Sequence, residues 1–231
     1  MKIHRFIDNF DLSGKEVEIT GEIAHQMAKV LKLEIGEQVE LCDGKGANAQ
    51  GKIKTLSKNS TIVEIEKIVK EPPAQKIVSL FCAVLKKENF ELVVQKATEC
   101  GVDKIIPIIT TRTIKMGLNM ERLQKISREA CEQSHRSILP EVSEPMSFEE
   151  SLELAKQNDV NIIFNADGEN FAHSAIAKSA KQGIWIGPEG GWTPEEIQLA
   201  EKNNFKKISL GTNILRGETA AIVSTFLVKN M

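Results

Sequence analysis

Tyrosine is absent from this 231-residue chain, and all aromatic residues together make up only 5% of it. Broad aromatic platforms for stacking nucleic-acid bases are therefore not expected, and the core must be mainly aliphatic. No apolar run approaches the roughly 20 residues that cross a bilayer, and residues 1–8 contain no apolar signal segment. We therefore expect a cytoplasmic protein with no membrane partner.

Cysteine is also scarce, with four thiols at Cys42, Cys82, Cys100 and Cys131. They lie far apart, form no Cys-x-x-Cys pair, and have no histidine near enough to complete a zinc pattern. We expect reduced packing residues and no metal site.

The sequence lacks both common phosphate-binding loops, Gly-x-x-x-x-Gly-Lys-Ser/Thr and Gly-x-Gly-x-x-Gly. A nucleoside triphosphate is therefore a poor candidate ligand, and a dehydrogenase lacks its dinucleotide fingerprint. The net charge is only −2, which argues against indiscriminate coating of nucleic acid. Residues 104–136 nevertheless hold seven basic residues, Lys115 among them, against three acidic ones, so a partner with phosphates can be met locally.

The segment Glu71-Pro72-Pro73-Ala74 predicts a domain boundary, because consecutive prolines interrupt both helices and strand ladders. Before it, alternating apolar and acidic residues predict strands near residues 16–19, 38–41 and 62–68, with a turn at 43–46. Apolar residues at helical spacing predict one helix over 22–33. Residues 1–71 are thus expected to form a small, partly closed β-barrel that carries a helix.

After the boundary, strands and helices alternate. Strands are expected at 77–84, 104–109, 160–165, 183–187 and 207–210, and helices at 88–100, 119–134, after Ser147, and at 218–230. This order predicts an α/β domain over 74–231, with a parallel sheet covered on both faces. Ligands bind such sheets beyond the carboxyl ends of the strands.

Two glycine-bearing stretches, residues 184–196 and 210–221, each run from a buried strand through a loop into a helix. Thr193, Pro194 and Glu196 predict the first helix start, with a capping box between the threonine and the glutamate. The loop before that helix has no basic residue, and its glycines leave the backbone open to a flat, uncharged ring. One strand-to-helix turn of this kind is unremarkable, but a pair favours a shared ligand site.

The first stretch contains Gly187-Pro188-Glu189-Gly190-Gly191, and the second contains Leu210-Gly211, Ile214-Leu215-Arg216 and Glu218-Thr219-Ala220. Together, at this distance, they resemble the C-terminal signature of the RsmE family of SPOUT-class methyltransferases, which act on small-subunit ribosomal RNA. The likeness extends to residues 90–102 and 130–134. The family usually has threonine where this chain has Gly217, and often glutamate where it has Thr111.

The resemblance implies a SPOUT-type parallel sheet with a C-terminal trefoil knot over about residues 184–221, preceded by a PUA-like RNA-binding domain. Arg5-Phe6 and residues 30–32 match the PUA-like part. It also implies a homodimer, and methyl transfer from S-adenosylmethionine to N3 of a uridine in 16S ribosomal RNA, with the assembled subunit as substrate.

The site residues are assigned within this reaction from their place in or beside the two loops and from their charge. Arg216 is expected to stabilise an oxyanion on the base, and Glu218 is a candidate base, with capping of the last helix as the alternative role. The cofactor-binding residues are expected to be Asn165, Ile186, Gly187, Pro188, Glu189, Gly190, Gly191, Leu210, Gly211, Ile214 and Leu215. The RNA backbone is assigned to Arg5, Lys32, Arg112 and Arg136.

Two other functions stay open at this point. One is a related SPOUT methyltransferase that modifies a ribose hydroxyl or a different base. The other is a non-catalytic ribosome-assembly factor that keeps the fold as an RNA-binding platform. Binding of S-adenosylmethionine and the identity of the modified nucleoside separate these functions.

Overall fold

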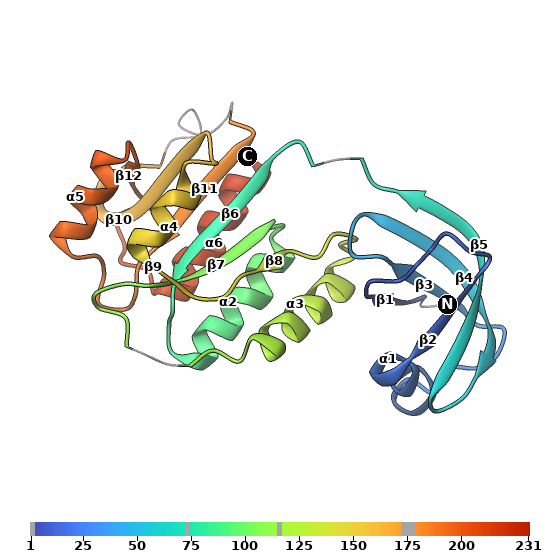
Figure 1. Cartoon of the computed structure of the whole chain (residues 1–231). Coiled ribbons are helices and arrows are strands. Elements are labelled where there is room, and N and C mark those ends of the chain that lie inside the picture. Colours follow the sequence, from blue (N-terminus) through green and yellow to red (C-terminus); the bar gives the residue numbers. More distant parts are fainter. Residues whose placement is uncertain (1–2, 73, 115–116, 172–178) are drawn as a thin grey trace. The chain divides into compact units, whose positions relative to one another are not determined.

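The computed structural model describes residues 3–72, 74–114, 117–171 and 179–231 (Figure 1). Pro73 of the predicted boundary and Lys115 of the basic segment lie outside the described residues. The chain divides into two compact units, Met1–Pro73 with Cys131–Leu139, and Ala74–Ala130 with Pro140–Met231. None of the described helices has the length and apolar character needed to cross a membrane.

The first unit is a curled five-stranded sheet (Figure 1). Its strands are β1 (His4–Ile7), β2 (Glu16–Thr20), β3 (Gln38–Cys42), β4 (Ala47–Leu56) and β5 (Ser60–Lys70), in the order β1-β3-β4-β5-β2. The alternation seen in the sequence decides which side chains face the core: Val17 and Ile19 are buried, whereas Glu16 and Glu18 are exposed. Strands β1 and β2 are the two ends of the sheet, so the expected barrel is only partly closed.

The helix predicted over 22–33 is shorter and less regular than its apolar spacing indicated. Helix α1 (Gly21–His25) continues as a π-helical turn, η1 (Gln26–Val30), in which the Leu31 N–H donates to the Gln26 carbonyl oxygen over 2.9 Å. A π-helical turn holds one more residue than an α-helical turn, so the side chains after it are rotated. Val30, expected on the apolar stripe, is therefore 65% exposed.

Residues 131–139 pack with the first unit, although they follow the predicted boundary by almost 60 positions in the sequence. The Ile7 N–H donates to Glu132 Oε1 over 3.1 Å, and Lys45 forms a β-bridge with Ile138. Arg5 donates to Ser137 Oγ over 2.6 Å, and Ser137 also contacts the Glu71 carboxylate. These hydrogen bonds therefore connect residues 131–139 to β1 and to the end of β5.

The second unit is built on a parallel sheet, as predicted. Its strands are β6 (Ile77–Ala83), β7 (Lys104–Ile109), β8 (Glu141–Val142), β9 (Met146–Ser147), β10 (Val160–Asn170), β11 (Lys181–Ile186) and β12 (Lys206–Ser209). The order is β12-β10-β11-β6-β7-β8, with β9 also pairing with β7. Strands β8 and β9 were not predicted, because two residues are too few to show alternation.

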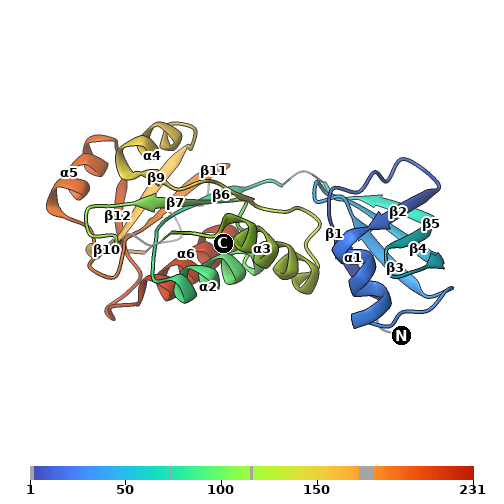
Figure 2. The ribbon, with the colours of Figure 1, turned by 60° about the horizontal axis from the view of Figure 1, so that its bottom comes forward.

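Helices cover both faces of this sheet (Figure 2). They are α2 (Lys87–Glu99), α3 (Met120–Ser134), α4 (Phe148–Ala155), α5 (Pro194–Lys202) and α6 (Gly217–Asn230). One core packs against α2 and α6, and the other holds Trp185 stacked on Phe81 with ring centroids 4.0 Å apart. The predicted capping box is present at Thr193 for α5, and Ser147 forms another with Glu150 at the start of α4, where a helix was expected.

Candidate active site

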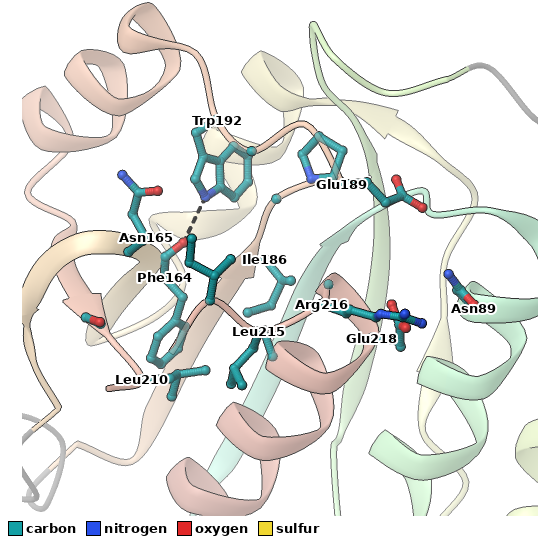
Figure 3. A pocket seen from close by; sticks show the side chains of 18 of the residues that line it. Asn89, Phe164, Asn165, Ile186, Glu189, Trp192, Leu210, Leu215, Arg216 and Glu218 are labelled. Carbon is teal, nitrogen blue, oxygen red and sulfur yellow. Dashed lines mark hydrogen bonds between the residues drawn. The ribbon is translucent and has the colours of Figure 1, made fainter. Parts of the chain in front are cut away.

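A pocket of about 650 Å³ opens at the carboxyl ends of β11 and β12, beside residues 164–166 of β10 (Figure 3). Because these strands are parallel, their carboxyl ends meet at one edge of the sheet. The lining consists of Lys86, Asn89, 164–166, 186–189, Gly191, Trp192, Ser209, Leu210, 213–218 and Ala220. The two glycine-bearing loops thus enclose one space together with residues 164–166, which belong to β10 because this strand continues beyond the predicted end at residue 165 to Asn170.

The loop after β11 is held in its conformation by a hydrogen bond within the loop and by a second one to β10. The Gly191 N–H closes a turn onto the Pro188 carbonyl oxygen over 2.8 Å, and the Trp192 indole donates to the Phe164 carbonyl oxygen over 3.0 Å. Gly187 lies against that indole: a Cβ there would come within 3.1 Å of the ring. A larger residue at 187 would therefore push the anchored tryptophan out of place.

Arg112 holds the same loop from outside. Its Nη1 donates to the Gly190 carbonyl oxygen over 2.7 Å and to the Trp192 carbonyl oxygen over 3.2 Å. The Thr111 N–H donates to Glu196 Oε1 over 2.9 Å, so the segment after β7 is also hydrogen-bonded to the start of α5. The guanidinium assigned to RNA is thus engaged with the loop backbone in this structure.

The loop after β12 turns at Gly211, whose φ of 125° is a conformation that side-chain-bearing residues rarely adopt. The Ser209 hydroxyl donates to the Gly211 carbonyl oxygen over 2.9 Å and closes this turn. Gly211 and Gly190 do not line the pocket, whereas the other predicted cofactor residues all do. These two glycines belong to the turns of the loops and are not part of the pocket wall.

Arg216 and Glu218 stand at the start of α6, on the side of the pocket nearest α2 (Figure 3). Arg216 is the N-cap residue, and its guanidinium forms no hydrogen bond or ion pair with any other described residue. Glu218 is only 7% exposed, and its buried Oε2 has no hydrogen-bond partner. Glu218 lies in the first turn of α6, where a carboxylate also interacts favourably with the helix dipole, so both roles considered for it stay open.

Gly217, where the family usually has threonine, is tightly packed. A Cβ at this position would lie 3.0 Å from Leu85 Cδ2 and 3.5 Å from the Gly187 carbonyl oxygen. The missing side chain therefore lets the start of α6 approach the first glycine of the β11 loop.

Two family models match the chain: an RNA methyltransferase domain over residues 50–229 and an RNA methyltransferase PUA domain over residues 19–66. The ribosomal RNA small subunit methyltransferase E of Rickettsia conorii is 32% identical over 237 residues, covering 99% of this chain and 96% of the relative. The chain belongs to the ribosomal RNA small subunit methyltransferase E family. The resemblance seen in the two glycine-bearing motifs is thereby confirmed.

Two other members of the family are also similar to this chain over most of its length. The Bacillus subtilis methyltransferase E is 31% identical over 221 residues, covering 88% of this chain and 86% of the relative. A crystal structure of the Neisseria gonorrhoeae methyltransferase E bound to S-adenosyl methionine superposes with a TM-score of 0.89 at 29% identity, covering 97% of this chain and 95% of that one. The expected α/β class with a PUA-like first domain is confirmed.

Within this methyltransferase E fold, the other residues assigned to RNA lie in the first unit. Lys32 is exposed just after the π-helical turn, with a positive φ of 52°. Arg136 is half-buried in the segment 131–139. Arg5 has a side chain only 7% exposed and donates to Glu40, Asn48 and Ser137, so its place is within the packed interior of that unit.

Several lining residues were not predicted from the sequence. Lys86 and Asn89 follow β6, and the rule that placed ligands beyond the strand ends applies to that strand too. Trp192 directly follows the glycine motif, but only the structure shows that its indole reaches β10. Asn213 and Ser209 gave no signal, because polar residues in loops are common.

The cysteines lie outside the pocket lining. Burial raises the pKa of Cys42 to about 12 and that of Cys131 to about 11, and burial also raises the pKa of Cys82 and Cys100. A thiol that stays protonated at neutral pH is a poor nucleophile. In the described part of the chain, no group of three metal-binding side chains comes together.

Proposed function

We propose that this protein transfers a methyl group from S-adenosylmethionine to N3 of a uridine in 16S ribosomal RNA. The observation that carries the proposal is the pocket at the carboxyl ends of β11 and β12, beside β10, with the unpaired Arg216 and the buried, unpaired Glu218 on one side of it. Family membership supplies the substrate class.

The pocket suits the cofactor in size and lining. Phe164, Ile186 and Leu215 give apolar walls, and Gly187 and Gly191 leave the backbone beside them uncovered. Such a surface fits a flat heterocycle that is recognised by main-chain groups. When bound, S-adenosylmethionine supplies the methyl group as an electrophile, and the carbon–sulfur bonding pair leaves on its sulfur.

The acceptor needs more help, because N3 of uridine carries a proton and forms part of the pairing edge of the base. That edge must be exposed to the enzyme, as in base flipping. We assign the N3 proton to Glu218, whose Oε2 has no other partner, and the negative charge that remains on the base to Arg216. The proton must leave first, because the methyl group enters along the same in-plane direction.

We propose that Lys32 and Arg136 contact the RNA backbone, but not Arg5 and Arg112. The guanidinium groups of Arg5 and Arg112 already donate hydrogen bonds to protein acceptors. Phosphate contacts set affinity and salt dependence rather than the chemical step. We also propose the assembled small subunit as the substrate.

A homodimer is proposed as well, supported by apolar side chains that the second unit leaves exposed. On α6, Val223 and Phe226 are exposed, the latter by 53%, and Leu92 is exposed on α2, which packs against α6. Exposed apolar groups of this size are suited to burial against a second copy. The trefoil knot over about residues 184–221 remains a prediction.

The decisive experiment incubates the purified protein with S-adenosylmethionine and small subunits from a strain lacking this methyltransferase. Nucleosides from the digested RNA are then separated by mass spectrometry, and 3-methyluridine is expected. A ribose-methylated nucleoside or a different methylated base would instead identify another SPOUT activity. No product, together with no calorimetric binding of S-adenosylmethionine, would favour the non-catalytic assembly factor. Protein-free 16S RNA in a parallel reaction tests the requirement for assembly.

Replacing Arg112 with alanine is expected to raise the dissociation constant for S-adenosylmethionine about tenfold. Two hydrogen bonds from a charged donor to the loop are lost, and bonds of this kind contribute about 1.5–3 kcal/mol each in favourable cases. Calorimetry measures the change, and a salt titration of RNA binding should keep its slope.

Arg122→Ala is the matched control, since it removes an exposed guanidinium that is paired with Glu91 and lies in the first turn of α3, outside the pocket lining. A flatter salt slope with unchanged cofactor affinity in Arg112→Ala would restore the original assignment of Arg112 to RNA.

A further inference from the structure

The first turn of α2 forms part of the pocket wall, and no role has so far been given to it. Lys86 and Asn89 line the pocket together with Arg216 and Glu218. Figure 3 shows Arg216 extending from the start of α6 towards Asn89, with Glu189 and Glu218 on the same side. Asn165, Phe164 and Leu210 lie on the opposite side, and the side that holds Arg216, Glu218 and Asn89 is called the acceptor side below.

Polar groups on the acceptor side lack partners. Oε2 of Glu218 is buried without a hydrogen bond. The side-chain amide of Asn89 makes no hydrogen bond with any residue that the structure describes, and Lys86 provides no side-chain cap for α2. Among these groups Glu218 Oε2 is the buried one, and a buried polar group without a partner costs free energy. The Asn89 amide is half-exposed in the wall of the same pocket, where it can hydrogen-bond to a ligand.

Arg216 supplies only donors, a carboxylate supplies only acceptors, and the Asn89 amide supplies both. The pairing edge of uracil presents two carbonyl oxygens as acceptors on either side of the N3–H donor. We propose that Asn89 is a specificity-determining residue, whose amide N–H donates to one uracil carbonyl oxygen while Arg216 donates to the other, which leaves N3 between them open to the methyl donor once its proton is lost. This inference rests on the proposed function and extends it to the recognition of the base.

The same arrangement rejects cytosine. Cytosine has an amino group in place of O4 and an unprotonated N3, so the Glu218 carboxylate would find no N3 proton to accept, and the Arg216 guanidinium, which has no acceptor, would face a donor when it lies opposite that amino group. Unpaired polar groups in a closed site give strong discrimination. Asn89 therefore also affects the chemical step, since a donor to a uracil carbonyl oxygen stabilises the base after its proton is lost.

Asn89→Ala tests the assignment in the full-length protein, with small subunits as substrate. We expect kcat for 3-methyluridine formation to fall about tenfold, with unchanged calorimetric affinity for S-adenosylmethionine. Alanine is a better helix former than asparagine, so α2 should remain intact. The control is Gln95→Ala, which shortens an exposed polar side chain two turns later on α2, outside the pocket lining.

A second substrate distinguishes recognition from a structural role. Subunits from cells grown with 5-fluorouracil carry a base whose fluorine lowers the pKa of N3–H, so the base loses its proton with less help. We expect this substrate to restore most of the kcat lost in Asn89→Ala. A kcat equal to that of wild type, or a loss that 5-fluorouracil does not restore, would overturn the role of Asn89. Absence of 3-methyluridine with the wild-type protein would instead overturn the proposed function itself.

Discussion

Replacing Arg216 with alanine is expected to lower kcat at least 100-fold with S-adenosylmethionine and small subunits both saturating. The reason is the charge that develops on the uracil carbonyl oxygens as N3 loses its proton. Arg216 lines the acceptor side of the pocket without an ion-pair partner in the described structure, so its full charge is available to the base. Loss of one preorganised donor to such an oxyanion commonly costs a factor of about 100–1000.

The measurement is single-turnover formation of 3-methyluridine at saturating ligand concentrations, which separates the chemical step from binding. Arg216→Lys is the companion variant: it keeps the charge but loses the planar pair of donors, so an intermediate rate is expected. Cofactor affinity, measured by calorimetry, should stay within a few-fold of wild type. Should Arg216→Ala turn over normally under these conditions, Arg216 has no part in catalysis.

Glu218→Gln is expected to lower kcat about 100-fold or more at neutral pH. Glutamine keeps the shape and one acceptor oxygen but cannot take the N3 proton, and general-base catalysis typically contributes a factor of 100–10,000. The substitution removes a buried charge whose Oε2 makes no hydrogen bond, so it should not destabilise the fold. A thermal unfolding curve of the variant verifies this.

The pH dependence gives an independent test of the same role. Without a base, only uridine that has already lost its N3 proton can react, and that fraction increases tenfold per pH unit below the pKa of N3–H. The rate of Glu218→Gln should therefore climb with pH and approach that of wild type in alkaline solution. A deficit that stays constant across the pH range would show that Glu218 acts in some way other than as a base.

Local sequence patterns predicted most of the second unit. Thr193 and Glu196 are three residues apart, and a capping box depends only on such neighbours, so the start of α5 could be located from them. The buried strands β6, β7, β10 and β11 were found from short apolar runs. The helix at 22–33 was wrong in its last turn, because a π-helical turn leaves no distinct pattern in the spacing of apolar residues.

The hydrogen-bond partners of two arginines could not be predicted from the sequence. Arg5 and Arg112 were assigned to RNA because of their charge, yet each guanidinium finds acceptors that lie far along the chain: Ser137 for Arg5 and the Gly190 carbonyl for Arg112. The same holds for Asn89, an ordinary polar residue in the first turn of a helix until the pocket is seen to include it.

The sequence by itself determined the order of most strands and helices, the two glycine-bearing loops, and the family to which the chain belongs. Each of these depends on residues within a few positions of one another, or on motifs that can be compared directly. The tertiary structure alone decided that residues 131–139 join the first unit, that Arg112 holds the β11 loop, and that Glu218 is buried without a partner. These features arise from contacts between residues that are distant in the chain, and no local pattern specifies which distant groups will meet.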